Sequence, residues 1–190
     1  MAITHTLLIS SDTLKRTTTI SQSVDDNLIH PVVLMAQDKY ILPVLGTDLF
    51  EKLKEDVEGT PSGDYATLLK DYVQKCLGQF TLALLYPVLR LRASRHSVVQ
   101  MDNEQGTSAS YDEIQPLISS ALDMGEFYRE RLIDYLQNNS SLFSEYSSNT
   151  GADMSPTTRN YYSGINMDSN ISSDSHVKAI LSAMGVKNIC

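Results

Sequence analysis

The chain has 190 residues, a formal net charge of −8 and 42% hydrophobic residues. This charge balance excludes a protein that grips nucleic acid through its phosphates, which needs clustered Lys and Arg. It is typical of an ordinary acidic protein, and it is also compatible with a conduit through which DNA slides without sticking. The two cysteines, Cys76 and Cys190, form no disulfide framework, and we expect the protein to reside in a reducing compartment such as a cytoplasm. No run approaches the roughly 20 apolar residues of a membrane span, so we expect no membrane partner.

The first 60 residues predict three helices. A short one follows Leu7-Leu8-Ile9, with Ser10 or Ser11 as its cap. The first long helix begins at Asp25 or Asp26, because acidic residues suit the positive amino end of a helix. Its apolar residues recur at helical spacing: Leu28, Val32, Met35, Ala36 and Tyr40. We expect Pro43 and Gly46 to end it, and Thr47 or Asp48 to cap the next helix, which runs to about Val57.

The middle of the chain predicts the longest helix, from a cap at Asp64 to about Arg92. Its apolar face is wide enough for burial on several sides. Pro87 lies inside it and predicts a bend between Leu84 and Pro87, since proline removes one backbone hydrogen bond.

Residues 93–110 have no helical period and predict either a short strand pair or an ordered loop. Ser110 and Glu113 then form a capping box. It opens a helix that ends near Asn138 or Asn139, with these apolar positions: Ile114, Leu117, Ile118, Ala121, Leu122, Tyr128, Leu132, Tyr135 and Leu136. The fold class is therefore all-α, a bundle of about four main helices with an irregular or short β loop.

Composition divides the chain near Tyr146. Residues 1–146 carry the helical pattern, whereas residues 147–190 are rich in Ser, Asn, Asp and Thr and cannot build a core of their own. A last short helix, Ser175 to Met184, is too short to hold alone in water and needs a surface. That surface belongs either to its own domain or to a partner.

No catalytic or cofactor chemistry is expected. The four histidines, His5, His30, His96 and His176, are scattered and none has the spacing of a metal-ligand pair. No glycine-rich phosphate loop and no nucleophile elbow occur in the sequence. We therefore expect no enzyme and no cofactor.

Two segments resemble head-tail connector proteins of tailed phages, above all those of short-tailed, crAss-like phages. The family's first helix pattern, "I-x-P-x-I-x-x-A-x-x-x-Y-I" followed by "P-x-L-G-x-x-L-Y-x-x-L", is matched by Ile29, Pro31, Val33, Ala36, Tyr40, Ile41, Pro43, Leu45, Gly46, Leu49, Phe50 and Leu53. The stretch from Gly125 to Asn138 resembles the family's last core helix, and Phe143-Ser144-Glu145-Tyr146 resembles the phrase that follows it. The resemblance covers about residues 6–146.

The resemblance implies a structural virion protein, made in the host cytoplasm and located at the head-tail junction. It implies a homo-oligomeric ring, commonly a dodecamer, that lies between the portal and the tail, extends the DNA channel and joins capsid to tail. Implied partners are the portal protein, neighbouring copies and other connector or tail proteins, while DNA passes without specific binding.

We expect two contact regions in such a protein. The C-terminal arm binds the portal or an adjoining subunit through Tyr161, Tyr162, Ile165, Ile180, Leu181 and Met184. The polar loop Asp102, Asn103, Glu104, Gln105 and Gly106 projects toward the channel or the next ring. The alternative is a cellular helical adaptor or regulatory bundle that binds a protein partner.

Overall fold

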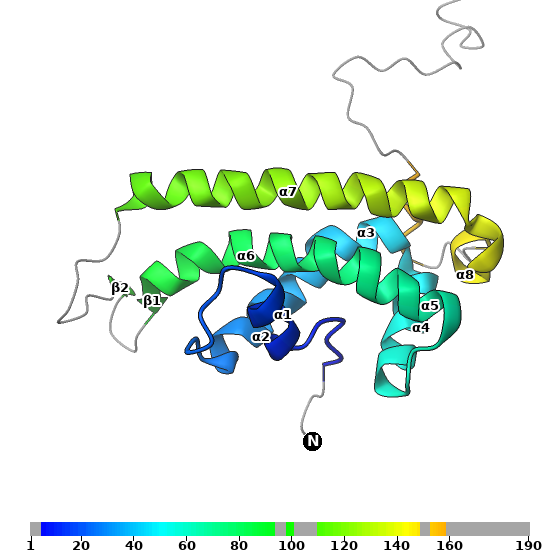
Figure 1. Cartoon of the computed structure of the whole chain (residues 1–190), viewed down its shortest axis with the longest axis horizontal. Helices are drawn as coiled ribbons and strands as arrows, with labels where there is room; N and C mark the ends of the chain where they lie inside the picture. Colours follow the sequence, from blue (N-terminus) through cyan, green and yellow to red (C-terminus); the bar gives the residue numbers. More distant parts are fainter. Residues whose placement is uncertain (1–4, 94–97, 101–109, 149–152, 159–190) are drawn as a thin grey trace, which may run out of the picture. The chain divides into compact units, whose positions relative to one another are not determined.

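The computed structural model describes residues 5–93, 98–100, 110–148 and 153–158. The described part is all-α with one small hairpin, as the sequence predicts (Figure 1). In chain order its elements are α1 (Ser11–Thr17), α2 (Asp26–Ala36), the π-helical turn η1 (Gln37–Ile41), α3 (Leu42–Leu45), α4 (Thr47–Glu58), α5 (Gly63–Thr67), the π-helical turn η2 (Leu68–Val73), α6 (Gln74–Arg90), β1 (Leu91–Ala93), β2 (Val98–Gln100), α7 (Tyr111–Asn138), the 3-10 turn η3 (Ser140–Leu142) and α8 (Ser144–Ser147).

The helix that starts at Asp26 continues to Leu45, and the prediction that Pro43 ends it was wrong. The wider π-helical turn η1 shifts the hydrogen-bond register, so that Pro43 falls in the first turn of α3, where a missing amide proton costs little. The helix ends instead at Gly46, whose φ of 75° favours glycine. Gly46 also precedes α4 directly, so Thr47 and Asp48 lie inside the first turn rather than at its cap.

The helix predicted as the longest is the continuous run α5, η2 and α6. Ser62 precedes its first turn, and the expected cap Asp64 lies inside that turn, where its charge favours the helix dipole. The helix passes through Pro87 and ends at Arg90, because Leu91 already belongs to β1. Strand β1 pairs antiparallel with β2, with Ala93 opposite Val98. Of the two alternatives for residues 93–110, the strand pair is therefore present at its start.

The predicted capping box opens α7. The Ser110 hydroxyl accepts a hydrogen bond from the Glu113 amide (3.3 Å), and the Glu113 carboxylate accepts one from the Ser110 amide (2.7 Å). This second bond lowers the pKa of Glu113. Helix α7 then runs antiparallel along α6 (Figure 1) and ends at Asn138 as expected.

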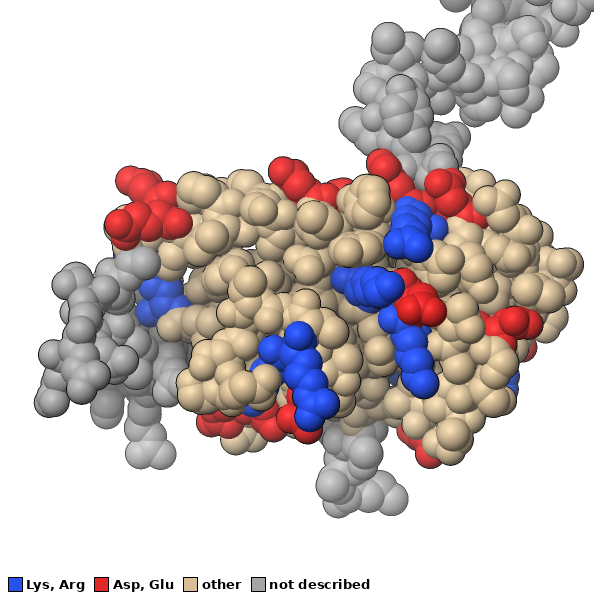
Figure 2. Space-filling model, in the orientation of Figure 1, with Lys and Arg blue, Asp and Glu red and all other residues tan. Residues whose placement is uncertain are grey.

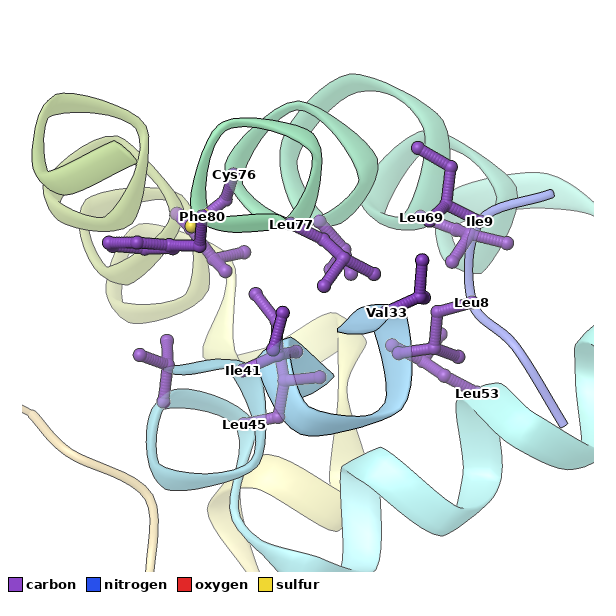
Figure 3. Close-up of a cluster of buried hydrophobic side chains, with 14 of the residues drawn as sticks. Leu8, Ile9, Val33, Ile41, Leu45, Leu53, Leu69, Cys76, Leu77 and Phe80 are labelled. Carbon is purple, nitrogen blue, oxygen red and sulfur yellow. The ribbon is translucent and has the colours of Figure 1, made fainter. Parts of the chain in front are cut away.

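Helix α6 lies between α2 and α7 and carries the centre of the core (Figure 3). Phe80 on α6 is completely buried, and its ring stacks on Tyr40 with centroids 3.9 Å apart. Gly125 on α7 faces the same ring, since a Cβ atom there would lie 2.8 Å from Phe80 Cε1. Glycine thus lets α7 approach α6 closely at the level of Phe80.

Two glutamine side chains attach the amino-terminal segment to this core. The Gln37 side-chain oxygen accepts the buried amide of Leu8 at 2.7 Å, and the Gln74 side chain donates to the Leu8 carbonyl at 2.9 Å. Gln37 is only 1% exposed. A buried amide of this kind is retained because it satisfies backbone groups that have no other partner there.

Beyond the boundary expected at residue 146, a short segment of residues 153–158 lies on the turn between α3 and α4, and we call it the strap. Most of the contacts that hold the strap are hydrogen bonds between polar groups.

Candidate protein-interaction surface

Helix α7 has two apolar stripes, of which the other described residues cover only one. The inner stripe is buried: Ile114, Ala121, Gly125, Leu132, Ile133 and Leu136. The outer stripe contains Leu117, Met124 and Phe127, which are 49%, 45% and 55% exposed. Leu117, one of the apolar positions that the sequence gives this helix, therefore lies on its exposed side. One stripe is enough to join a helix to a core, so the outer stripe is available to a partner.

The outer stripe is contiguous along the helix. Leu117 and Met124 are two turns apart, and Phe127 follows one turn later, so the stripe spans about 15 Å at 1.5 Å per residue. Serines between the large side chains leave a shallow hollow on this face, lined by Pro116, Ser119, Ser120, Asp123, Met124 and Phe127. The Phe127 ring rests edge-on against Tyr128, with centroids 5.4 Å apart. The stripe therefore offers a partner both an aromatic side chain and a shallow hollow.

Charge is unevenly distributed around this helix. Acidic side chains follow the edge that α7 forms, whereas the face below it carries most of the visible Lys and Arg, interspersed with further Asp and Glu (Figure 2). Asp112 and Glu113 contribute the acidic groups at the first turn of α7. Surfaces of opposite sign on one molecule attract when two copies meet head to tail.

A groove lies on the basic side, where the end of α1 meets α6. It has a volume of about 240 Å³ and is lined by Thr17, Thr18, Gln74, Lys75, Gly78, Gln79 and Tyr128. Lys75 lies at its rim with a partly exposed side chain, and its ammonium nitrogen is 3.6 Å from an Asp71 carboxylate oxygen. The domain thus carries an apolar stripe with acidic neighbours and a groove with an ion pair at its rim, and the two adjoin where Phe127 packs against Tyr128.

A polar contact joins α5 to α8 at the end of the bundle. The Tyr65 hydroxyl donates a hydrogen bond of 2.7 Å to the Glu145 carboxylate. Partial burial, together with this bond, raises the pKa of Tyr65 to about 12. Burial, the largest single influence, would raise the pKa of Glu145, but the hydrogen bonds from Tyr65, the Glu145 backbone and Ser144, together with the charge of Lys52, outweigh it, and the pKa is lowered. The contact orients α8 and leaves no group poised for proton transfer.

Within the described ranges, no three His, Cys, Asp or Glu residues lie close enough to hold a metal ion. The helix from Asp26 to Leu45 has the length and composition of a membrane span, with a mean hydropathy of 1.2. However, Ile29, Val33 and Ile41 on this helix are completely buried in the domain, which is the arrangement of a core helix.

The residues that the sequence selected as contacts are not among these. The arm residues Tyr161, Tyr162, Ile165, Ile180, Leu181 and Met184 and the loop residues Asp102, Asn103, Glu104, Gln105 and Gly106 lie outside the described residues. Sequence reasoning missed the outer stripe of α7. Its signal was present, because Met124 and Phe127 are apolar residues that fall off the main stripe.

Comparison with known proteins gives one family. The model of a family of unknown function, DUF6712, matches residues 41–155, from the end of η1 into the strap. No curated protein and no solved structure matches the chain.

Proposed function

Because the chain belongs to DUF6712, a family of unknown function, we propose a function from its own sequence and surfaces. It is a structural virion protein that forms a homo-oligomeric ring between the portal and the tail of a tailed phage. There it extends the DNA channel and joins capsid to tail. Its partners are the portal protein, neighbouring copies and other connector or tail proteins.

The connector-like sequence patterns support this proposal together with the all-α fold. The two patterns fall on helices that pack in the core, from α2 to α4 and along the second half of α7. A net charge of −8 is compatible with a ring that lets DNA pass without holding it.

The observation that carries the proposal is the outer stripe of α7. A ring requires each copy to use two different patches, one for each neighbour, because a closed cyclic assembly beyond a dimer is head-to-tail. The outer stripe of α7 and the groove beside Lys75 are lined by different residues and can serve as two such patches. We assign them to the contact between neighbouring copies.

The test compares two methionines of similar exposure. Met124 is 45% exposed on the outer stripe, and Met35 is 52% exposed on α2. Met124→Ser should lower the fraction of copies that assemble into rings on a phage portal, whereas Met35→Ser should leave it unchanged. Assembly would be measured by mass photometry and electron microscopy of the full chain with and without the portal.

Two outcomes would count against the proposal. Equal assembly of both variants would remove the α7 stripe from the ring contact. A wild-type chain that stays monomeric with portals and instead binds a cellular protein would favour the adaptor function.

The arm and the loop complete the proposal. The arm residues from Tyr161 to Met184 are too sparse in apolar groups to order themselves without a partner, so we assign them to the portal or to an adjoining subunit. A chain that ends at Ser147 should stay folded yet fail to join the portal. Deletion of Asp102 to Gly106 should preserve helical content and impair the addition of later tail components.

A further inference from the structure

The turn between α3 and α4 presents backbone groups that no helix satisfies. The Pro43 carbonyl lies at the end of α3, and the Thr47 amide lies at the start of α4. Helix ends leave such groups without intrahelical partners. In this structure the strap supplies the partners: the Thr157 amide donates to the Pro43 carbonyl (2.8 Å), and the Thr47 amide donates to the Met154 carbonyl (3.0 Å).

The Thr47 side chain adds two further hydrogen bonds to the strap. Its hydroxyl accepts the Met154 amide at 3.0 Å and donates to the Asp153 carboxylate at 3.1 Å. One threonine therefore uses both its donor and its acceptor on the same segment. This side chain is the one that the sequence predicted as a helix cap, and it binds the strap instead.

Gly46 makes room for the strap. Its φ of 75° is a conformation that favours glycine, and a Cβ atom at this position would lie only 2.7 Å from Pro156 Cδ. The proline ring thus occupies the space that any other residue's side chain would fill. Glycine is thus required at position 46 for two reasons, its backbone conformation and the close approach of Pro156. The second reason applies only while the strap is docked.

The strap ends on α7. The Gln137 side chain donates a hydrogen bond to the Thr158 carbonyl. Pro156 and Thr157 are half-buried, while the other four strap residues are exposed. The strap is therefore held by polar groups and one proline ring rather than by core burial, and segments of this kind open at a lower free energy than the domain unfolds.

We propose that the Pro43–Thr47 turn is a docking site for an extended, proline-containing segment, that the chain's own strap is its ligand, and that release of the strap lengthens the C-terminal arm. With the strap docked, the arm is tethered beside Gln137. With the strap released, the tether moves back to Ser148. The ten residues freed in this way span up to about 35 Å when extended. The proposal that the arm makes use of this added reach rests on the proposed function of the arm. The docking of the strap does not depend on that function.

The test uses the isolated full chain, so that it does not depend on a portal. Gly46→Ala should raise the hydrogen-exchange rates of the Thr47 and Thr157 amides by about tenfold or more, the factor that corresponds to 1.4 kcal/mol, and leave amides in the middle of α6 and α7 protected. The largest dimension in small-angle X-ray scattering should increase. Gly63→Ala is the matched control, because Gly63 also has a positive φ of 59° but a Cβ atom there would have no neighbour within 4 Å.

A second variant guards against a local folding defect in Gly46→Ala. Thr47→Val removes both hydroxyl bonds to the strap without changing the turn, and it should raise exchange of the Thr157 amide and extend the particle in the same way. Unchanged exchange and dimensions in Gly46→Ala and Thr47→Val, or an equal effect of Gly63→Ala, would overturn the docking site. Failure of the arm to bind portals, with these results intact, would overturn only the proposed function of the arm.

Discussion

The two faces of α7 differ in what covers them, although both are apolar. The inner face meets α6 through Leu132, which is completely buried, and through Gly125, which faces Phe80. The outer face exposes half of Leu117 and Phe127. Apolar residues alone thus do not define the core of this domain. Helix α7 therefore carries more apolar surface than the other described elements cover, and the excess is what a partner would cover.

The largest expected difference comes from the same truncation on each face. Leu132→Ala should lower the free energy of unfolding by about 2 to 5 kcal/mol, because it leaves a cavity in a packed core. Leu117→Ala should change it by less than about 0.5 kcal/mol in the free subunit. Urea denaturation of both variants measures the difference, and similar losses would show that the outer face is already covered in the free subunit.

The inner face should also reject added volume. Gly125→Ala improves helix propensity, but its methyl group would collide with the Phe80 ring, which Tyr40 holds from the other side. We expect a net loss of about 1 to 3 kcal/mol in thermal or chemical unfolding. A more stable variant would mean that α6 and α7 can move apart at no cost.

The buried side of the helical bundle also contains a polar group. The Thr81 hydroxyl on α6 is buried without a hydrogen-bond partner among the described residues. Thr81→Val should raise the free energy of unfolding by about 1 kcal/mol, because an unsatisfied buried hydroxyl carries a desolvation cost. The same substitution at the half-buried Thr13 serves as the control, since its hydroxyl already has a partner in the Ser10 hydroxyl at the start of α1. A destabilised Thr81→Val protein would imply a bound water or another partner at that hydroxyl.

The smallest expected effect is on pH dependence at the end of the bundle. The pKa of Glu145 is lowered in the folded state, so the bond from Tyr65 contributes fully above the ordinary carboxyl pKa and is lost as the pH falls through the lowered value. The raised pKa of Tyr65, about 12, acts in the opposite direction, and its contribution is lost only as the pH rises toward that value. Tyr65→Phe should remove about 1 kcal/mol or less at neutral pH and flatten the acid limb of the stability curve. An unchanged acid limb would assign that limb to other carboxylates.

Much of the helical frame could be predicted because short-range chemistry decides it. The caps at Ser10 and Asp25, the capping box at Ser110 and the end of α7 depend on side chains within four residues of one another. The continuation of the helix through Pro43 was not predicted. The π-helical turn before it adds a residue to the turn and shifts the register, and no local pattern announces such a shift.

The surfaces were harder to predict than the frame. An apolar residue off the main stripe indicates either a wide buried face or an exposed patch, and only the position of α6 decides between them at Leu117. The strap was missed for a different reason. It binds mainly through backbone groups, so its docking leaves no periodicity in Asp153–Thr158 and only a glycine, Gly46, at the place where it lies.

Burial of Cys76 has a practical consequence for following the arm. Its Sγ atom lies 3.8 Å from the Gly125 carbonyl, and burial raises the pKa of the thiol far above its usual range. Thiol reagents react with the thiolate, so Cys76 is silent toward maleimide in the folded domain. The chain has one other cysteine, Cys190, its last residue. A fluorophore attached to the native, folded protein should therefore label Cys190 in the arm without any engineered residue.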